Sequence, residues 1–153
     1  MTWADLIIKI VSAAATAAIG VAALIIAYQQ LKLAKYRQKH DLFDRRFETF
    51  MKVREFVSAV ALGQQFDAGE FYRNTIERRF LFTDTAIANY FDEVYERANK
   101  VVAFKNELER PNLPADEIRA LKAHLSAQKT WFYNQSDEMF RLFKNDLSTK
   151  TLE

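Results

Sequence analysis

The sequence predicts an all-α protein in which one N-terminal transmembrane helix continues into an up-down-up bundle of cytosolic helices. Three observations indicate this fold class. Residues 10–28 contain no charged side chain. The 153 residues include only three glycines and two prolines, which favours long helices joined by few turns. After the uncharged run, apolar residues recur in the four–three steps of a helix, with no alternating run typical of a strand.

The uncharged run, IVSAAATAAIGVAALIIAY, is long enough to cross the hydrocarbon core of a bilayer, which is about 30 Å thick. A secretory signal peptide is one alternative, but its positive charges precede a shorter apolar run. Here Asp5 and Lys9 cancel, and the basic residues follow the run. A buried helix of a soluble protein is the other alternative. We favour a single-pass anchor with the N-terminus outside and the body in the cytoplasm, because cationic residues stay on the cytoplasmic side.

The anchor carries small residues four positions apart, which let two helix backbones approach closely in lipid. The predicted packing positions are Ala14, Thr16, Ala18 and Gly20. We therefore expect a homo-oligomer held together through the span and the helical body, with membrane lipid and a further protein as the other expected partners. An alanine-rich helix that simply spans the membrane is the alternative.

The positions of glycine and proline predict the remaining helices. No breaker occurs between Gly20 and Gly63, so the helix leaving the membrane should continue to Gly63. Its apolar stripe in four–three steps comprises Phe43, Phe47, Phe50, Val57 and Ala61. These features divide the chain into a transmembrane anchor (1–29), a basic neck helix (30–40), a cytosolic helical bundle (41–147) and a frayed tail (148–153).

Three further helices complete the predicted bundle. A short helix is expected at about residues 70–80, and Thr83 or Asp84 should cap the next one. That helix should end near Arg110, where two prolines interrupt the sequence RPNLP. The last helix is predicted as one element from Pro114 to about Leu147.

Two stretches, residues 35–57 and 78–98, carry the motifs DLFDRRFE and RFLFTD…YFDEVY. Together they resemble a widespread group of small bacterial membrane proteins with one N-terminal span, a cytosolic helical domain and no known activity. The resemblance implies this architecture and a bacterial origin. In physical terms both motifs suit a packing role, and the predicted core aromatics are Phe43, Phe47, Phe80, Phe82, Tyr90 and Phe91.

Paired arginines form the candidate ligand site of the body. Guanidinium groups bind phosphate through two parallel hydrogen bonds, so clustered arginines suit a phosphate or a nucleotide. The candidate residues are Arg45, Arg46, Arg54, Arg73, Arg78 and Arg79. The alternative is ion pairing with neighbouring carboxylates at helical spacing, for which Asp44, Glu48, Glu55 and Glu77 are available.

Trp131 and Tyr133 belong to a run of three aromatic residues, of which only one or two can face the bundle's own core. They are candidates for an oligomer or partner interface, where Trp and Tyr are enriched. Packing against the first cytosolic helix is an equally good interpretation.

The sequence offers no chemical constellation typical of an enzyme. It has no cysteine, and its two histidines, His40 and His124, lack a second ligand at metal spacing. A net charge of +2 is not the strongly basic stripe of a nucleic-acid binder. We expect no catalysis, cofactor, metal or nucleic-acid polymer.

The function predicted on these grounds is a membrane-anchored, self-associating helical scaffold or membrane effector, with bacterial defence as a speculative setting. The alternative is a nucleotide- or phosphate-sensing membrane protein gated through its arginine-rich cytosolic bundle.

Overall fold

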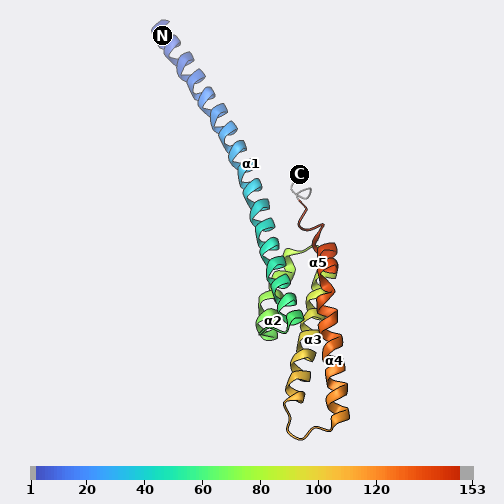
Figure 1. Cartoon of the computed structure of the whole chain (residues 1–153). Coiled ribbons are helices and arrows are strands. Elements are labelled where there is room, and N and C mark those ends of the chain that lie inside the picture. The colour runs from blue at the N-terminus through green and yellow to red at the C-terminus, as the bar shows by residue number, and fades with distance from the viewer. Residues whose placement is uncertain (1–2, 149–153) are drawn as a thin grey trace. The chain divides into compact units, whose positions relative to one another are not determined.

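The computed structural model describes residues 3–148, apart from the side chains of residues 5–6 and 8–13. The predicted frayed tail therefore lies almost wholly outside the described residues. Five α-helices and one 3₁₀ helix make up this part of the chain, which contains no strand (Figure 1). They are α1 (Trp3–Leu62), α2 (Ala68–Ile76), η1 (Arg78–Leu81), α3 (Thr85–Leu108), α4 (Ala115–Tyr133) and α5 (Gln135–Phe143). The all-α prediction is confirmed.

The chain divides into two units, residues 1–41 and residues 42–153. In the first unit, every side chain that the structure describes is exposed. This unit contains the most apolar part of α1, and one candidate span, with a mean hydropathy of 1.6, is found between Ala14 and Leu62. The prediction of a long apolar N-terminal helix is confirmed, whereas a membrane crossing stays a proposal.

Helix α1 ends where the sequence predicts. Gly63 adopts a positive φ of 71°, a conformation that glycine reaches without steric cost. The amides of Gly63 and Gln64 donate to the carbonyls of Val60 and Ala59, at 3.1 and 2.9 Å. This left-handed ending satisfies carbonyl groups that would otherwise lack a partner at the helix terminus.

The second unit, here called the body, has one apolar core to which every α-helix contributes. From α1 come Phe50, Val53, Val57 and Val60, all buried. Helix α2 adds Phe71, α3 adds a row from Ile87 to Val101, α4 adds Phe132, and α5 adds Met139 and Phe143. Aromatic rings therefore fill much of the interior. Helices α3 and α4 lie side by side, joined by a short loop (Figure 1).

The predicted core aromatics are only partly confirmed. Phe82, Tyr90 and Phe91 are buried and Phe43 is half-buried. The prediction is wrong for Phe47, which is 46% exposed, and for Phe80, which is 91% exposed. Phe80 lies in η1, where three residues complete a turn, so it points outward while Phe82 just beyond the 3₁₀ helix is buried.

The helix expected at about residues 70–80 is two elements, α2 and η1, separated at Glu77. Asp67 caps α2 by accepting a hydrogen bond from the Glu70 amide at 3.0 Å. Of the two predicted caps of α3, Asp84 fills the position, and its carboxylate accepts from the Ala86 amide at 2.8 Å. Helix α3 ends at Leu108, two residues before the predicted boundary.

The prediction of one helix from Pro114 to about Leu147 is wrong. The helix breaks at Asn134, which lies between α4 and α5 with φ −85° and ψ 3°. The side-chain amide of buried Gln135 donates to the Trp131 carbonyl at 3.2 Å and stabilises the break. Asparagine favours such breaks because its side chain competes with the helical backbone. The body thus has more elements than a three-helix bundle, and the up-down-up arrangement stays a prediction.

Candidate functional site

Arg46 is the most deeply buried of the six candidate arginines, with 8% of its surface exposed. Its Nε donates to the Leu81 carbonyl at 2.6 Å. Its Nη1 lies 3.2 Å from a carboxylate oxygen of Asp146, and the same carboxylate accepts from Thr83 at 3.1 Å. Arg46 therefore joins α1 to the end of η1 and to the turn after α5. These contacts occupy Nε and Nη1 of a buried side chain, so Arg46 links segments of the body that lie far apart in the sequence.

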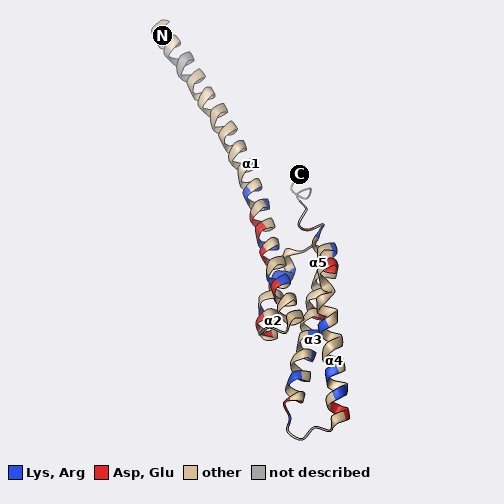
Figure 2. Cartoon of the chain, in the orientation of Figure 1, with Lys and Arg blue, Asp and Glu red and all other residues tan. Residues whose placement is uncertain are grey.

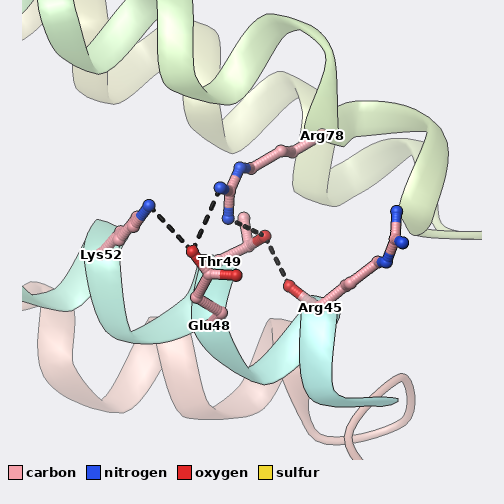
Figure 3. A network of polar contacts seen from close by, with 5 residues as sticks. All are labelled: Arg45, Glu48, Thr49, Lys52 and Arg78. Carbon is pink, nitrogen blue, oxygen red and sulfur yellow. Dashed lines mark hydrogen bonds and ion pairs between the residues drawn. The ribbon is translucent and has the colours of Figure 1, made fainter. Parts of the chain in front are cut away.

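Arg78 belongs to a polar network between α1 and η1, drawn in Figure 3. Its guanidinium donates to Glu48 at 3.2 Å and to the Thr49 hydroxyl at 3.3 Å. Lys52 contacts the same Glu48 oxygen at 2.8 Å. Hydrogen bonds from Lys52 and then Arg78 lower the pKa of Glu48, so its carboxylate stays ionised and balances part of the positive charge.

Arg79, which follows Arg78 in η1, forms a bidentate ion pair with Asp92 on α3. Together with Arg46 and Arg78, it fixes η1 to both α1 and α3. Three of the candidate arginines, Arg46, Arg78 and Arg79, thus form ion pairs with carboxylates, which was the alternative to a ligand site. Two of the carboxylates involved, Asp92 and Asp146, are not among those that helical spacing suggested.

The other three candidates do not join a common site. Figure 3 shows the Arg45 guanidinium pointing away from Glu48, while its backbone carbonyl accepts from Thr49 at 2.8 Å. Arg54 is exposed on α1. Arg73 is exposed on α2, and its charge adds to the hydrogen bond from the Glu70 amide, which is the main cause of the lowered pKa of Asp67. A phosphate or nucleotide site built from all six arginines stays a prediction without geometric support.

A groove of about 470 Å³ lies beside the Arg78 network, between α1 and α2. Phe56 and Phe71, whose rings stack at 4.2 Å, line its apolar part. Its polar lining has two cations, Lys52 and Arg78, and three carboxylates, Glu55, Asp67 and Glu70. Because the carboxylates outnumber the cations, the groove does not favour an anionic ligand.

The predicted packing positions of the span, Ala14, Thr16, Ala18 and Gly20, are all exposed on α1. Nothing lies within 4 Å of the place that a Cβ on Gly20 would occupy. Within a single chain, therefore, no contact requires a glycine here. Figure 2 shows the uncharged part of α1 and the charged residues that follow it, which begin with Lys32 and Lys35.

The two candidate interface aromatics lie in different surroundings. Trp131 is half-buried, and the Arg97 guanidinium of α3 lies over its ring at 4.3 Å from the centroid. Trp131 therefore packs within its own body, which was the alternative to an oligomer or partner interface. Tyr133 is 73% exposed at the end of α4. Only Tyr133 keeps a large free surface.

The predicted core residue Tyr90 brings a hydroxyl group into the interior of the body. The Tyr90 hydroxyl is buried and has no hydrogen-bond partner within the described residues. Burial, helped by the charges of Glu138 and Glu93, raises the pKa of Tyr90 well above 10. The hydroxyl therefore stays protonated at any physiological pH, which gives it no acid–base role.

The remaining titratable groups form no recognisable chemical site. Among the side chains that the structure describes, no three His, Cys, Asp or Glu residues lie close enough together to hold a metal ion. His124 stacks on Phe104, with 5.6 Å between ring centroids. Charged groups of the body join its helices to one another.

A comparison with protein-family models, with curated proteins and with solved structures finds no match to this chain. The resemblance of its motifs to small bacterial membrane proteins therefore stays a prediction.

Proposed function

We propose that this chain is a single-pass protein of the bacterial inner membrane that self-associates and acts through its cytosolic helical body as a scaffold or membrane effector, without catalysis. The observation that carries the proposal is the exposed apolar surface of α1. Ile19, Leu24 and Ile26 are 71%, 72% and 54% exposed, and the 18-residue window that marks the candidate span is 0% buried. Apolar surface of this extent favours lipid or another helix over water.

The charge pattern supports the orientation. Lys32, Lys35, Arg37 and Lys39 follow the uncharged run within about 17 Å of its end along the helix, whereas Asp5 and Lys9 balance each other before it. Positively charged flanking residues stay on the cytoplasmic side. The N-terminus then lies outside and the body lies in the cytoplasm.

Gly20 supports self-association through the span. Glycine inside a helix costs about 1 kcal/mol relative to alanine, and no contact within one chain needs it at this position. A second helix that packs against Ala14, Thr16, Ala18 and Gly20 supplies a reason for the small side chains, because they allow close backbone approach.

The test is chemical crosslinking of the full chain in native membranes, compared with a Gly20→Leu variant. The wild type should give dimers or larger species. Gly20→Leu should reduce them about tenfold or more, because a leucine separates the backbones while the helix of a single chain gains stability. Leu24→Ile, a change of shape in the bulkier half of the span, is the matched control and should crosslink like the wild type. A strictly monomeric wild-type protein would contradict the proposal.

A further inference from the structure

Exposed apolar side chains lie at both ends of the seam between α1 and the α4–α5 end of the body. At one end of the seam, exposed Phe47 lies 6.4 Å from Phe50, and Phe50 lies 5.4 Å from exposed Phe140 of α5, measured between ring centroids. At the other end, exposed Leu62 and Tyr133 line a groove of about 650 Å³. We call this surface the seam face and define it by Phe47, Arg54, Leu62, Tyr133, Asp137 and Phe140.

The seam face continues a sequence pattern that the core uses only in part. Phe43, Phe47, Phe50, Arg54, Val57 and Ala61 follow one another in four–three steps, the spacing of a helix that packs along another helix. Of these, only Phe50 and Val57 are buried. The core-facing side of α1 is instead centred on Thr49, Val53 and Val60. The four–three stripe therefore lies at the edge of the core, and half of its residues are not packed into the core.

Two opposite charges lie at one level of this surface. Helix α5 runs antiparallel to α1, with Phe140 against Phe50 and Asp137 in the groove with Val57 and Ser58. Arg54 is four residues beyond Phe50, and Asp137 is three residues before Phe140. Because the two helices run antiparallel, Arg54 and Asp137 both lie about 5 Å from the Phe50–Phe140 ring contact, in the same direction along the helices.

Neither charge is used within the body. Arg54 and Asp137 are both exposed, and neither side chain forms an ion pair or a hydrogen bond with any residue in the described part of the chain. Arg46, Arg78, Arg79, Arg97 and Arg141, in contrast, all have carboxylate partners.

We propose that the seam face is a two-fold contact between two copies of this chain, in which Arg54 of each copy pairs with Asp137 of the other around an apolar centre of Phe47 and Phe140. A two-fold contact is reciprocal, so one unpaired cation and one unpaired anion at the same level form two ion pairs. The proposal rests on the proposed function, because membrane anchoring gives all copies the same orientation and so makes a two-fold axis along the membrane normal available.

The charge composition selects a second copy over a lipid surface. An anionic membrane surface attracts clusters of four or more basic residues, at about 1 kcal/mol each. The seam face carries one positive and one negative charge, which sum to zero. A self-complementary pair suits a copy of the same surface.

The decisive experiment exchanges the charges in the full chain, reconstituted in lipid vesicles. The chain has no cysteine, so Ser58→Cys in the groove reports close approach of two copies by disulfide formation. In that background, Arg54→Glu and Asp137→Arg should each lower the crosslinking rate about fivefold to tenfold, and the double exchange should restore it to within about twofold. Unchanged circular dichroism establishes that the exposed substitutions leave the fold intact.

Two further cysteines separate this proposal from the proposed function. Asn99→Cys, exposed on α3, measures random collision and should crosslink at least about fivefold more slowly than Ser58→Cys. Gly20→Cys reports association of the spans. Rapid crosslinking at position 20 with only collisional crosslinking at position 58 would overturn the seam contact and leave the proposed function standing. Failure of the double exchange to restore crosslinking would also overturn the seam contact. Absence of crosslinking at both positions would overturn both.

Discussion

Residues 3–41 and residues 42–148 are both helical, but they differ in where their apolar side chains lie. In the first unit, all the described apolar side chains are exposed, including Ile19 and Leu24 at more than 70%. In the body, sixteen apolar side chains form one buried cluster. Helical structure alone therefore does not show what stabilises a segment. The body is stabilised by its own core, whereas the described side chains of the first unit are all exposed and form no such core.

The two regions also differ in their charged residues. The apolar run of α1 has no charged residue between positions 10 and 28. In the body, arginine–carboxylate ion pairs hold the irregular segments in place. Arg46 and Arg79 both contact η1 or extend from it. Substitutions can test this contrast, beginning with the one for which we expect the largest effect.

Asp146→Ala should destabilise the body by about 3–5 kcal/mol, because it leaves the buried Arg46 guanidinium without its counter-charge. Urea unfolding of the full chain in detergent, followed by the fluorescence of Trp131, measures the change in free energy of unfolding. Far-ultraviolet circular dichroism should show that the helix of residues 3–41 persists after the body has unfolded.

Glu96→Ala is the matched control for this substitution. Glu96 is an exposed carboxylate of the same body on α3, and no ion pair or hydrogen bond is formed by its side chain within the described residues. Its removal should leave the unfolding midpoint unchanged. Equal changes in the free energy of unfolding for Asp146→Ala and Glu96→Ala would show that water hydrates Arg46 when Asp146 is removed. The Arg46–Asp146 ion pair would then contribute little to the stability of the body.

Ile19→Lys should act on the first unit alone. A lysine near the centre of a span costs about 3 kcal/mol of insertion free energy relative to isoleucine. The fraction of the chain that resists alkaline extraction from membranes should fall, while the urea midpoint of the body stays the same. Tyr36→Lys, at an exposed position beyond the apolar run, is the control and should stay in the membrane. If Ile19→Lys and the wild type are extracted to the same extent, the apolar helix is not a span.

Sequence reasoning predicted the features that depend on local pattern. The missing breaker before Gly63 predicted where α1 ends. Capping chemistry narrowed the start of α3 to two residues, of which Asp84 holds the position. These features depend on hydrogen bonds and side-chain spacing within a few turns, so one chain segment contains all the information.

The features that sequence reasoning missed depend on distant residues. Arg46 and Asp146 are 100 positions apart, and no helical spacing connects them. The break at Asn134 depends on a glutamine that is buried only because α5 packs on the core. Phe80 looked like a core residue because the sequence did not reveal a 3₁₀ turn that three arginines hold in place. Each of these features is decided by tertiary packing, which a pattern along one helix does not record.

Tyr90 offers the smallest expected effect, and it tests whether the interior of the body is dry. Its hydroxyl is buried without a partner, and burial raises its pKa above the ordinary value of 10.0. An unfolded tyrosine loses its proton near pH 10, whereas the folded one keeps it. The folded state thus binds more protons above that pH, and the free energy of unfolding should fall as the pH rises beyond 10. Below pH 10 this contribution is constant.

Tyr90→Phe should leave the body as stable as the wild type at pH 8, or more stable by about 1 kcal/mol, because it removes a buried polar group that has no partner. Above pH 10 its stability should fall less steeply than that of the wild type, as measured by urea unfolding in detergent between pH 8 and 11. Tyr133→Phe removes an exposed hydroxyl and should keep the wild-type slope. Identical slopes for the wild type, Tyr90→Phe and Tyr133→Phe would mean that water reaches the Tyr90 hydroxyl. The interior of the body would then be less dry than its buried side chains indicate, and the body would differ less from the exposed apolar helix of the first unit.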